Sequence, residues 1–242
     1  MIKKKSLSNY LNYSKNHISS FVFLLPLLII YEFIHFYKFY DLNYEIRNSA
    51  DKILRDIFKY IFNDYFHYYT FLIILILLII YFNNYKKIHS FIIKPKYLFL
   101  MYIEGLILGY LLVYILNDYQ TISYLSESFY NDIFFLFYMS LGAGIWEEFL
   151  FRFLFISLFL FLLTKVFNKN IFNTHICILL SAIIFSLFHY IGYSSETFQL
   201  YSFIIRFLGG LILGYIYIIR GLGIASMTHF CYDLFLISFP LI

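Results

Sequence analysis

The residues of this sequence best placed to do chemistry are two adjacent carboxylates, Glu147 and Glu148, with Arg152 one helical turn further on. They interrupt a stretch that is otherwise apolar enough to lie in a membrane. Each charged side chain at the centre of a bilayer costs about 3 kcal/mol on insertion scales. Such expensive groups indicate a function, and a positioned carboxylate can act as a general base.

The spacing of these three residues gives the two glutamates different surroundings. On a helix, Glu148 and Arg152 are four residues apart and share a face, so they can form an ion pair. Glu147 is rotated from Glu148 by about 100° and faces a neighbouring helix or a cavity. One carboxylate is then neutralised and the other is available, which is how one site separates a base from a structural anion.

Three further ionisable residues lie in later apolar runs. His189 stands near the end of one run, one turn after Phe185, and His229 and Asp233 are one turn apart in the last run. Ionisable groups inside membranes usually face the bundle and pair with one another. We therefore expect these side chains to converge with Glu147 from three different helices.

The same residues form three ordered motifs that resemble those of one family. The pattern is EExxxR on one helix, FxxxH on the next and HxxxN/D near the end, here at 147–152, 185–189 and 229–233. It is similar to the CPBP family, which unites type II CAAX prenyl proteases with bacteriocin-processing and self-immunity (Abi) proteins. A glycine-rich stretch before the third motif also resembles that family, and the resemblance covers roughly residues 131–233.

The resemblance implies an intramembrane endopeptidase that depends on a glutamate. Carried over to this sequence, Glu147 would activate a water molecule, helped by His189. His229 and Asp233 would stabilise the tetrahedral oxyanion, and Glu148 would tune the site. The implied catalytic residues are Glu147, Glu148, His189, His229 and Asp233, with structural support from Arg152 and Phe185.

Two positions depart from the family's pattern. Asp233 stands where Asn is frequent, and an ionised Asp donates no hydrogen bond to an oxyanion. Asp233 would instead orient or charge His229, or be protonated. Phe153 follows Arg152 where Gly is common, which concerns the packing of the helix more than the chemistry.

The composition is that of an integral membrane protein. Hydrophobic residues make up 62% of the chain and charged residues 13%, whereas soluble domains are about half apolar and a quarter charged. The polar connectors are too short to hold a soluble domain, so the expected surroundings are a lipid bilayer, with no nucleic-acid partner. Cys177 and Cys231 lie within apolar runs and predict neither a disulfide nor a zinc pair.

The expected fold is an all-α polytopic transmembrane bundle of about seven spans plus one interfacial amphipathic helix. The fourth span is too long for one perpendicular crossing, so it must tilt, project from the membrane or break near Gly142 and Gly144. Residues 1–130 would supply the N-terminal spans and 131–242 the CPBP-like catalytic core of the same membrane domain. The spans are expected at 18–37, 65–82, 98–116, 131–163, 172–191, 199–219 and 222–240.

The interfacial helix is predicted over 49–62, where apolar residues at helical spacing alternate with charges. Ser49 is a suitable N-cap for it. Most lysines and arginines of the short connectors fall on one side of the membrane if the N-terminus is cytoplasmic. We therefore expect a multi-pass cell-membrane protein whose N-terminus is inside and whose C-terminus is outside.

The other polar residues of the spans have structural interpretations. Glu32 and His35 form an ExxH that we expect to be an interfacial pair rather than half of a di-iron site. Glu104 would either line the cavity or snorkel to the interface. Arg206 would pair with an acid such as Glu196 or Asp233. Two GxxxG spacings, 105–109 and 210–214, predict close contacts between helices.

Other functions compete with the peptidase. A non-catalytic bacteriocin self-immunity or scaffold protein would keep the same fold. A transporter would show a pseudo-repeat between its halves, and the sequence shows none. The glutamate mechanism needs no cofactor, but two histidines and a glutamate could also bind zinc with an open position for water, although HExxH is absent. The expected substrate is a peptide or a membrane-protein segment; neither the cleaved bond nor the oligomeric state is predicted.

Overall fold

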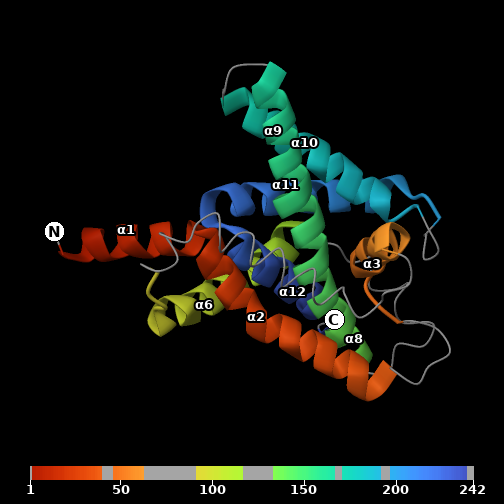
Figure 1. Ribbon diagram of the computed structural model, residues 1–242, viewed down its shortest axis with the longest axis horizontal. Coiled ribbons are helices and arrows are strands. Elements are labelled where there is room, and N and C mark those ends of the chain that lie inside the picture. Colours follow the sequence, from red (N-terminus) through yellow and green to blue (C-terminus); the bar gives the residue numbers. More distant parts are fainter. Residues whose placement is uncertain are drawn as a thin grey trace.

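The computed structural model describes residues 2–39, 46–62, 91–116, 133–166, 171–191 and 197–238. Every regular element in these ranges is a helix, as the composition predicts (Figure 1). The chain is a polytopic helical membrane protein, and five of the predicted spans are confirmed. The helices long and apolar enough to cross a membrane, within the described ranges, are His17–Phe39, Pro95–Leu116, Phe134–Val166, Ile171–Phe188 and Leu200–Arg220.

The two other predicted spans have different outcomes. The span expected at 65–82 lies outside the described residues. The last one forms helix α12 (Leu222–Ser238), which at 17 residues is shorter than the five candidates. Residues 221–231 of this stretch are all buried, and α12 packs against α6, α8, α11 and α2. Helix α12 is therefore the central helix of the bundle.

The chain begins with two helices joined at a sharp bend. Helix α1 (Ile2–Lys15) is followed by α2 (His17–Ile34), which continues into a π-helical turn, His35–Phe39. Asn16 caps α2, because its side-chain oxygen accepts a hydrogen bond of 2.9 Å from the backbone N–H of Ile18. This cap fixes the direction in which the first span leaves α1.

The predicted amphipathic helix is present as α3 (Ser49–Phe62), but its predicted N-cap is wrong. The cap is Asn48, whose Oδ1 accepts a hydrogen bond of 2.9 Å from the backbone N–H of Ala50. Asn and Ser cap helices about equally well, so sequence alone does not separate two adjacent candidates. Ile53 and Ile57 of α3 point away from the bundle.

One long helical rod runs through the molecule from α8 to α9, coloured green in Figure 1. It consists of α8 (Ile133–Gly142), two π-helical segments, Ala143–Glu147 and Phe149–Ile156, and α9 (Ser157–Val166). The irregularity expected near Gly142 and Gly144 therefore takes the form of a change from α to π hydrogen bonding. The rod does not break, and Glu147 ends the first π-helical segment.

The first GxxxG spacing lies against the central helix. Gly105 and Gly109 of α6 (Pro95–Leu116) face α12 so closely that an added Cβ would lie 2.5 Å from Met227 Cβ and 2.6 Å from Cys231 Cβ, respectively. Atoms that are not bonded do not approach to this distance, so only glycine fits at both positions. The predicted helix contact is confirmed.

The second GxxxG spacing joins α11 (Leu200–Arg220) to α10 (Ile171–Phe188). A Cβ added at Gly214 would lie 2.8 Å from Ile178 Cγ2, and one added at Gly210 would lie 3.2 Å from atoms of α10. This prediction is confirmed as well. The two glycine contacts hold α6, α10, α11 and α12 close enough to enclose the site described next.

Candidate active site

Glu148 forms a buried ion pair with Arg152, as the four-residue spacing predicts. Arg152 Nε lies 3.1 Å from Glu148 Oε2, and neither side chain is exposed. The guanidinium group also stacks on the ring of Phe185, 4.5 Å from its centroid. The pair anchors the π-helical rod to α10 and supplies a fixed cation inside the bundle.

The other oxygen of Glu148 contacts the central helix. Oε1 lies 2.9 Å from Nδ1 of His229, which is 5% exposed. Because a carboxylate only accepts, Nδ1 carries the proton of this hydrogen bond. Glu148 therefore sets the orientation of the His229 ring, a contact that the sequence does not predict.

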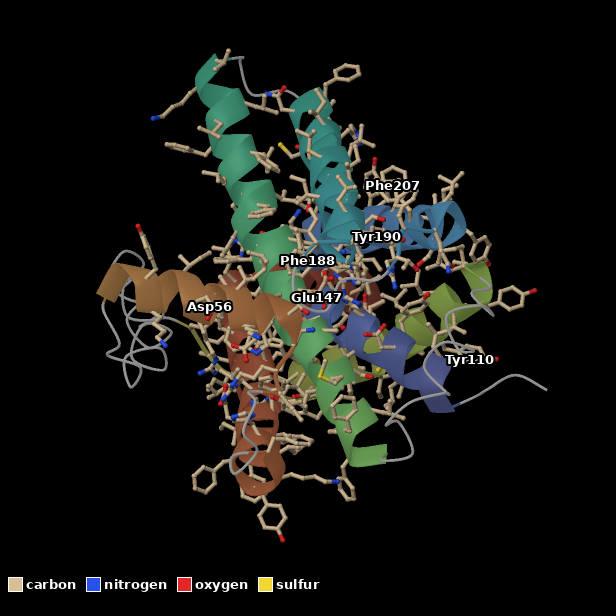
Figure 2. The ribbon with its side chains drawn as sticks, turned by 90° about the vertical axis from the view of Figure 1, so that its right-hand side faces the viewer. Asp56, Tyr110, Glu147, Phe188, Tyr190 and Phe207 are labelled. Atoms are coloured by element: carbon tan, nitrogen blue, oxygen red, sulfur yellow. The ribbon has the colours of Figure 1, made fainter. Side chains whose placement is uncertain are left out.

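Glu147 has different partners from its neighbour. Its Oε1 accepts a hydrogen bond of 2.8 Å from the side-chain amide of Asn48, which precedes α3. The residue is 6% exposed and lines a cavity. Figure 2 places Glu147 in the interior of the bundle, whereas the labelled Asp56 and Tyr110 lie on the outer faces of α3 and α6.

The cavity beside Glu147 has a volume of about 280 Å³. Apolar side chains from α6, α8, α11 and α12 form much of its wall, and polar groups from several helices interrupt them. The charged and hydrogen-bonding side chains include Asn48, Glu147, His189, Arg206, His229 and Asp233. A cavity with convergent polar groups in an apolar wall is the usual form of a binding site for a small ligand or a peptide segment.

His189 lies in the turn that directly follows α10. Its Nδ1 is 3.0 Å from the backbone oxygen of Phe185. Since a carbonyl only accepts, Nδ1 holds the proton of this hydrogen bond, and Nε2 would be the acceptor in a neutral ring. Phe185 contacts both histidines, with ring centroids 5.2 Å from His189 and 5.8 Å from His229, so it separates and supports the two imidazoles.

Asp233 approaches the second nitrogen of His229. Its Oδ2 lies 3.7 Å from Nε2, which is within the range of an ion pair but longer than a hydrogen bond. His229 therefore has a carboxylate near each ring nitrogen, Glu148 at Nδ1 and Asp233 at Nε2. The closer partner is Glu148, which is the more buried of the two.

The structure thus brings all the sequence-predicted site residues together. Five of them line the cavity, namely Glu147, Phe185, His189, His229 and Asp233, while Glu148 and Arg152 lie behind it and hold its wall. Arg206 also lines the cavity, and its guanidinium donates to the hydroxyl of Tyr190 at 3.3 Å. Glu196, one of its two expected partners, lies outside the described residues.

Two other polar residues of the spans lie away from the cavity wall. Glu104 pairs with Arg220 at 2.7 Å and accepts a hydrogen bond of 2.6 Å from Tyr10, so it links α6, α11 and α1. Glu32 pairs with arginines rather than with His35. In the part of the chain that the structure describes, no group of three or more His, Cys, Asp or Glu side chains has the arrangement of a metal site.

Asn48 is the site residue that sequence reasoning missed. It lies in a connector 99 residues before Glu147, and no motif or spacing relates the two. The available signal was its suitability as an N-cap, which predicts a helix start but no contact with a distant carboxylate.

Comparison with known proteins agrees with the three motifs. Residues 129–235 match the family model described as type II CAAX prenyl endopeptidase Rce1-like. No curated protein and no solved structure matches the chain. The matched range contains every predicted catalytic residue, and it confirms the resemblance drawn from the motifs. Residues 129–235 are therefore an Rce1-like domain of the type II CAAX prenyl endopeptidase family, whose members are hydrolases.

Proposed function

We propose that this protein is an intramembrane endopeptidase in which Glu147 activates the attacking water. The observation that carries the proposal is the cavity wall, where the Glu147 carboxylate faces the same space as His189, His229 and Asp233. Family membership independently supports a membrane protease with a peptide substrate. Base, donors and an apolar enclosure are the parts that peptide hydrolysis requires.

The reaction would proceed by direct attack of water. Glu147 accepts a proton as the water oxygen bonds to the peptide carbonyl carbon, and the carbonyl oxygen becomes an oxyanion. Collapse of this tetrahedral intermediate breaks the C–N bond, and the proton held by Glu147 passes to the leaving amine. His189 Nε2, the acceptor nitrogen of its ring, would help to orient the water.

His229 would stabilise the oxyanion. With Nδ1 directed to Glu148, its Nε2 is the nitrogen nearer the cavity residue Asp233. Two flanking carboxylates favour the imidazolium form, which has a donor at Nε2. Asp233 would support that charge. Glu148 is then a positioning residue for His229, and Arg152 balances its charge.

The proposal includes an arrangement of the chain in the membrane. Seven spans, with α3 lying in the interface and the N-terminus in the cytoplasm, agree with the five candidate spans and with the outward-facing isoleucines of α3. Substrates would be short peptide precursors, such as those of bacteriocins or signalling peptides, or segments of membrane proteins. They would reach the cavity from the membrane or its surface.

Cleavage of a peptide library by the purified protein in nanodiscs tests the proposal. The library should include prenylated and unprenylated members, and wild type should be compared with Glu147→Ala and with Lys165→Ala. Lys165 is exposed at the end of the same helical rod. Its variant therefore serves as a control for a nonspecific loss of folding or activity. Products from wild type and Lys165→Ala alone are expected. A folded wild type that cleaves no peptide would favour the non-catalytic immunity or scaffold role.

A further inference from the structure

Asn48 has one possible orientation in this site. Its Oδ1 accepts from the backbone N–H of Ala50 at 2.9 Å, and a backbone N–H can only donate. The other end of the amide, Nδ2, must then be the donor to Glu147 Oε1 at 2.8 Å. Asn48 is 4% exposed, so both ends of a buried amide have partners.

A network of buried groups holds the backbone of Asn48. Its N–H donates to the hydroxyl of Tyr31 at 3.2 Å, and that hydroxyl donates to Asp51 at 3.0 Å. Asp51 pairs with Arg47 at 2.9 Å and with Arg55 at 2.8 Å. Both guanidinium groups also contact Glu32 of α2, at 3.2 and 2.8 Å. The start of α3 is therefore fixed to α2 by charges that pair with one another.

The rod that carries Glu147 has a glycine, Gly142, where the connector packs against it. A Cβ added at Gly142 would lie 2.8 Å from Asn48 Cβ and 2.8 Å from Tyr31 Cε2. Glycine at this position lets the connector and α2 approach the first π-helical segment. The charged network behind the connector and the glycine on the rod therefore both help to bring Asn48 close to Glu147.

We propose that Asn48 is a positioning residue for the catalytic base, an inference that rests on the proposed function of Glu147. A neutral donor on Oε1 favours the ionised carboxylate. It also fixes the plane of that group and leaves Oε2 to accept a proton from water. Asn48 lies outside the matched range 129–235, so the catalytic core takes this part of its site from the N-terminal half.

The charged groups around Glu147 define what a pH experiment would report. The turn after α10 contributes His189 to the cavity, and helices α11 and α12 contribute Arg206, His229 and Asp233. The rod itself contributes Glu148 and Arg152. Behind Asn48 lie Glu32 of α2, Arg47 of the connector, and Asp51 and Arg55 of α3. A variant that changes only Asn48 leaves all of these groups in place.

Asn48→Asp separates the two contacts of the amide. Aspartate still accepts from Ala50 as an N-cap, but it replaces the donor to Glu147 with a like charge. We expect kcat to fall about tenfold or more and the acidic limb of the pH profile to move up by about one pH unit, because a neighbouring carboxylate opposes ionisation of the base. Asn16→Asp is the matched control, since Asn16 caps α2 in the same way and is exposed.

A second variant and a thermal measurement complete the test. Asn48→Ser keeps a capping oxygen without a charge and is too short to reach Glu147, so it should lower kcat while keeping the protein folded. Wild-type kcat in Asn48→Ser, or an unmoved acidic limb in Asn48→Asp, would overturn the proposal. The double variant Asn48→Ser/Glu147→Ala should also lower Tm by less than the sum of the two single shifts, because each single change already removes the contact. If the Tm shifts of the variants are coupled but the wild-type protein cleaves no peptide, the proposed function is rejected and the contact is retained. If the wild-type protein is active but the Tm shifts are additive, the contact is rejected.

Discussion

At the scale of single residues, the proposed mechanism depends on the difference between two adjacent glutamates. Glu147 has a neutral amide on one oxygen and a cavity in front of it. Glu148 has Arg152 on one oxygen and His229 on the other, with no exposure to solvent. Different surroundings allow identical side chains to serve as a base and as a structural anion.

Removal of Arg152 should destabilise the protein strongly. Arg152→Ala leaves Glu148 buried with less compensation, and breaking one side of a buried pair costs about 3–5 kcal/mol. Thermal unfolding in detergent should show a much lower Tm for this variant than for Lys165→Ala, which changes an exposed charge on the same rod. Equal Tm values for the two variants would show that the buried pair is not required for stability.

Chelators separate the glutamate mechanism from the zinc alternative. If Glu147 activates water unaided, prolonged treatment with EDTA should leave the cleavage rate unchanged, because no step uses a metal ion. Rates are measured before and after dialysis, and again after zinc is added. A loss of activity that zinc restores would instead assign Glu147 and the two histidines as ligands.

At the scale of elements, the π-helical segment Ala143–Glu147 places the glutamates against α12. Such segments change the direction of side chains within a helix and are frequent at functional sites. Here the close approach depends on Gly144, where an added Cβ would lie 2.6 Å from the backbone oxygen of Ser226 and 2.7 Å from Phe230 Cβ. The packing of the rod on α12 therefore determines where Glu148 and His229 meet.

Gly144→Ala should disturb this contact and lower stability. Overpacking against backbone costs about 1–3 kcal/mol, and the rod must move away from α12 to relieve it. Gly209→Ala is the comparison for thermal stability, because its Cβ would meet only the end of the Leu116 side chain, at 3.3 Å. A Tm loss in Gly144→Ala that is no greater than in Gly209→Ala would contradict the close-packing argument.

At the scale of the whole molecule, hydropathy predicted most of the described helices, and the motifs named most of the ionisable side chains that line the cavity. Runs of apolar residues determine where spans lie, so the five described spans agree with expectation. The contacts of Glu148 with His229 and of Asn48 with Glu147 were not predicted. They join residues 81 and 99 positions apart, and helix packing rather than local spacing creates such contacts. The choice between Asn48 and Ser49 as a cap likewise depends on the fold.

The orientation of the whole molecule can be tested with one introduced thiol. Ser8 lies exposed on α1, whereas both native cysteines are buried. With the N-terminus in the cytoplasm, Ser8→Cys should react with a membrane-impermeant maleimide only after cells are permeabilised. Labelling in intact cells would contradict the predicted topology, because it would place the N-terminus outside the cell.

The proposed general-base role of Glu147 is tested most directly by comparing Glu147→Gln with wild type. Glutamine keeps the size of the side chain and can still contact Asn48, but it cannot take a proton from water. Single-turnover cleavage of a peptide that wild type hydrolyses should slow by about a hundredfold or more, with an unchanged Tm as evidence of folding. A Glu147→Gln protein that cleaves this peptide at the wild-type rate would contradict the assignment.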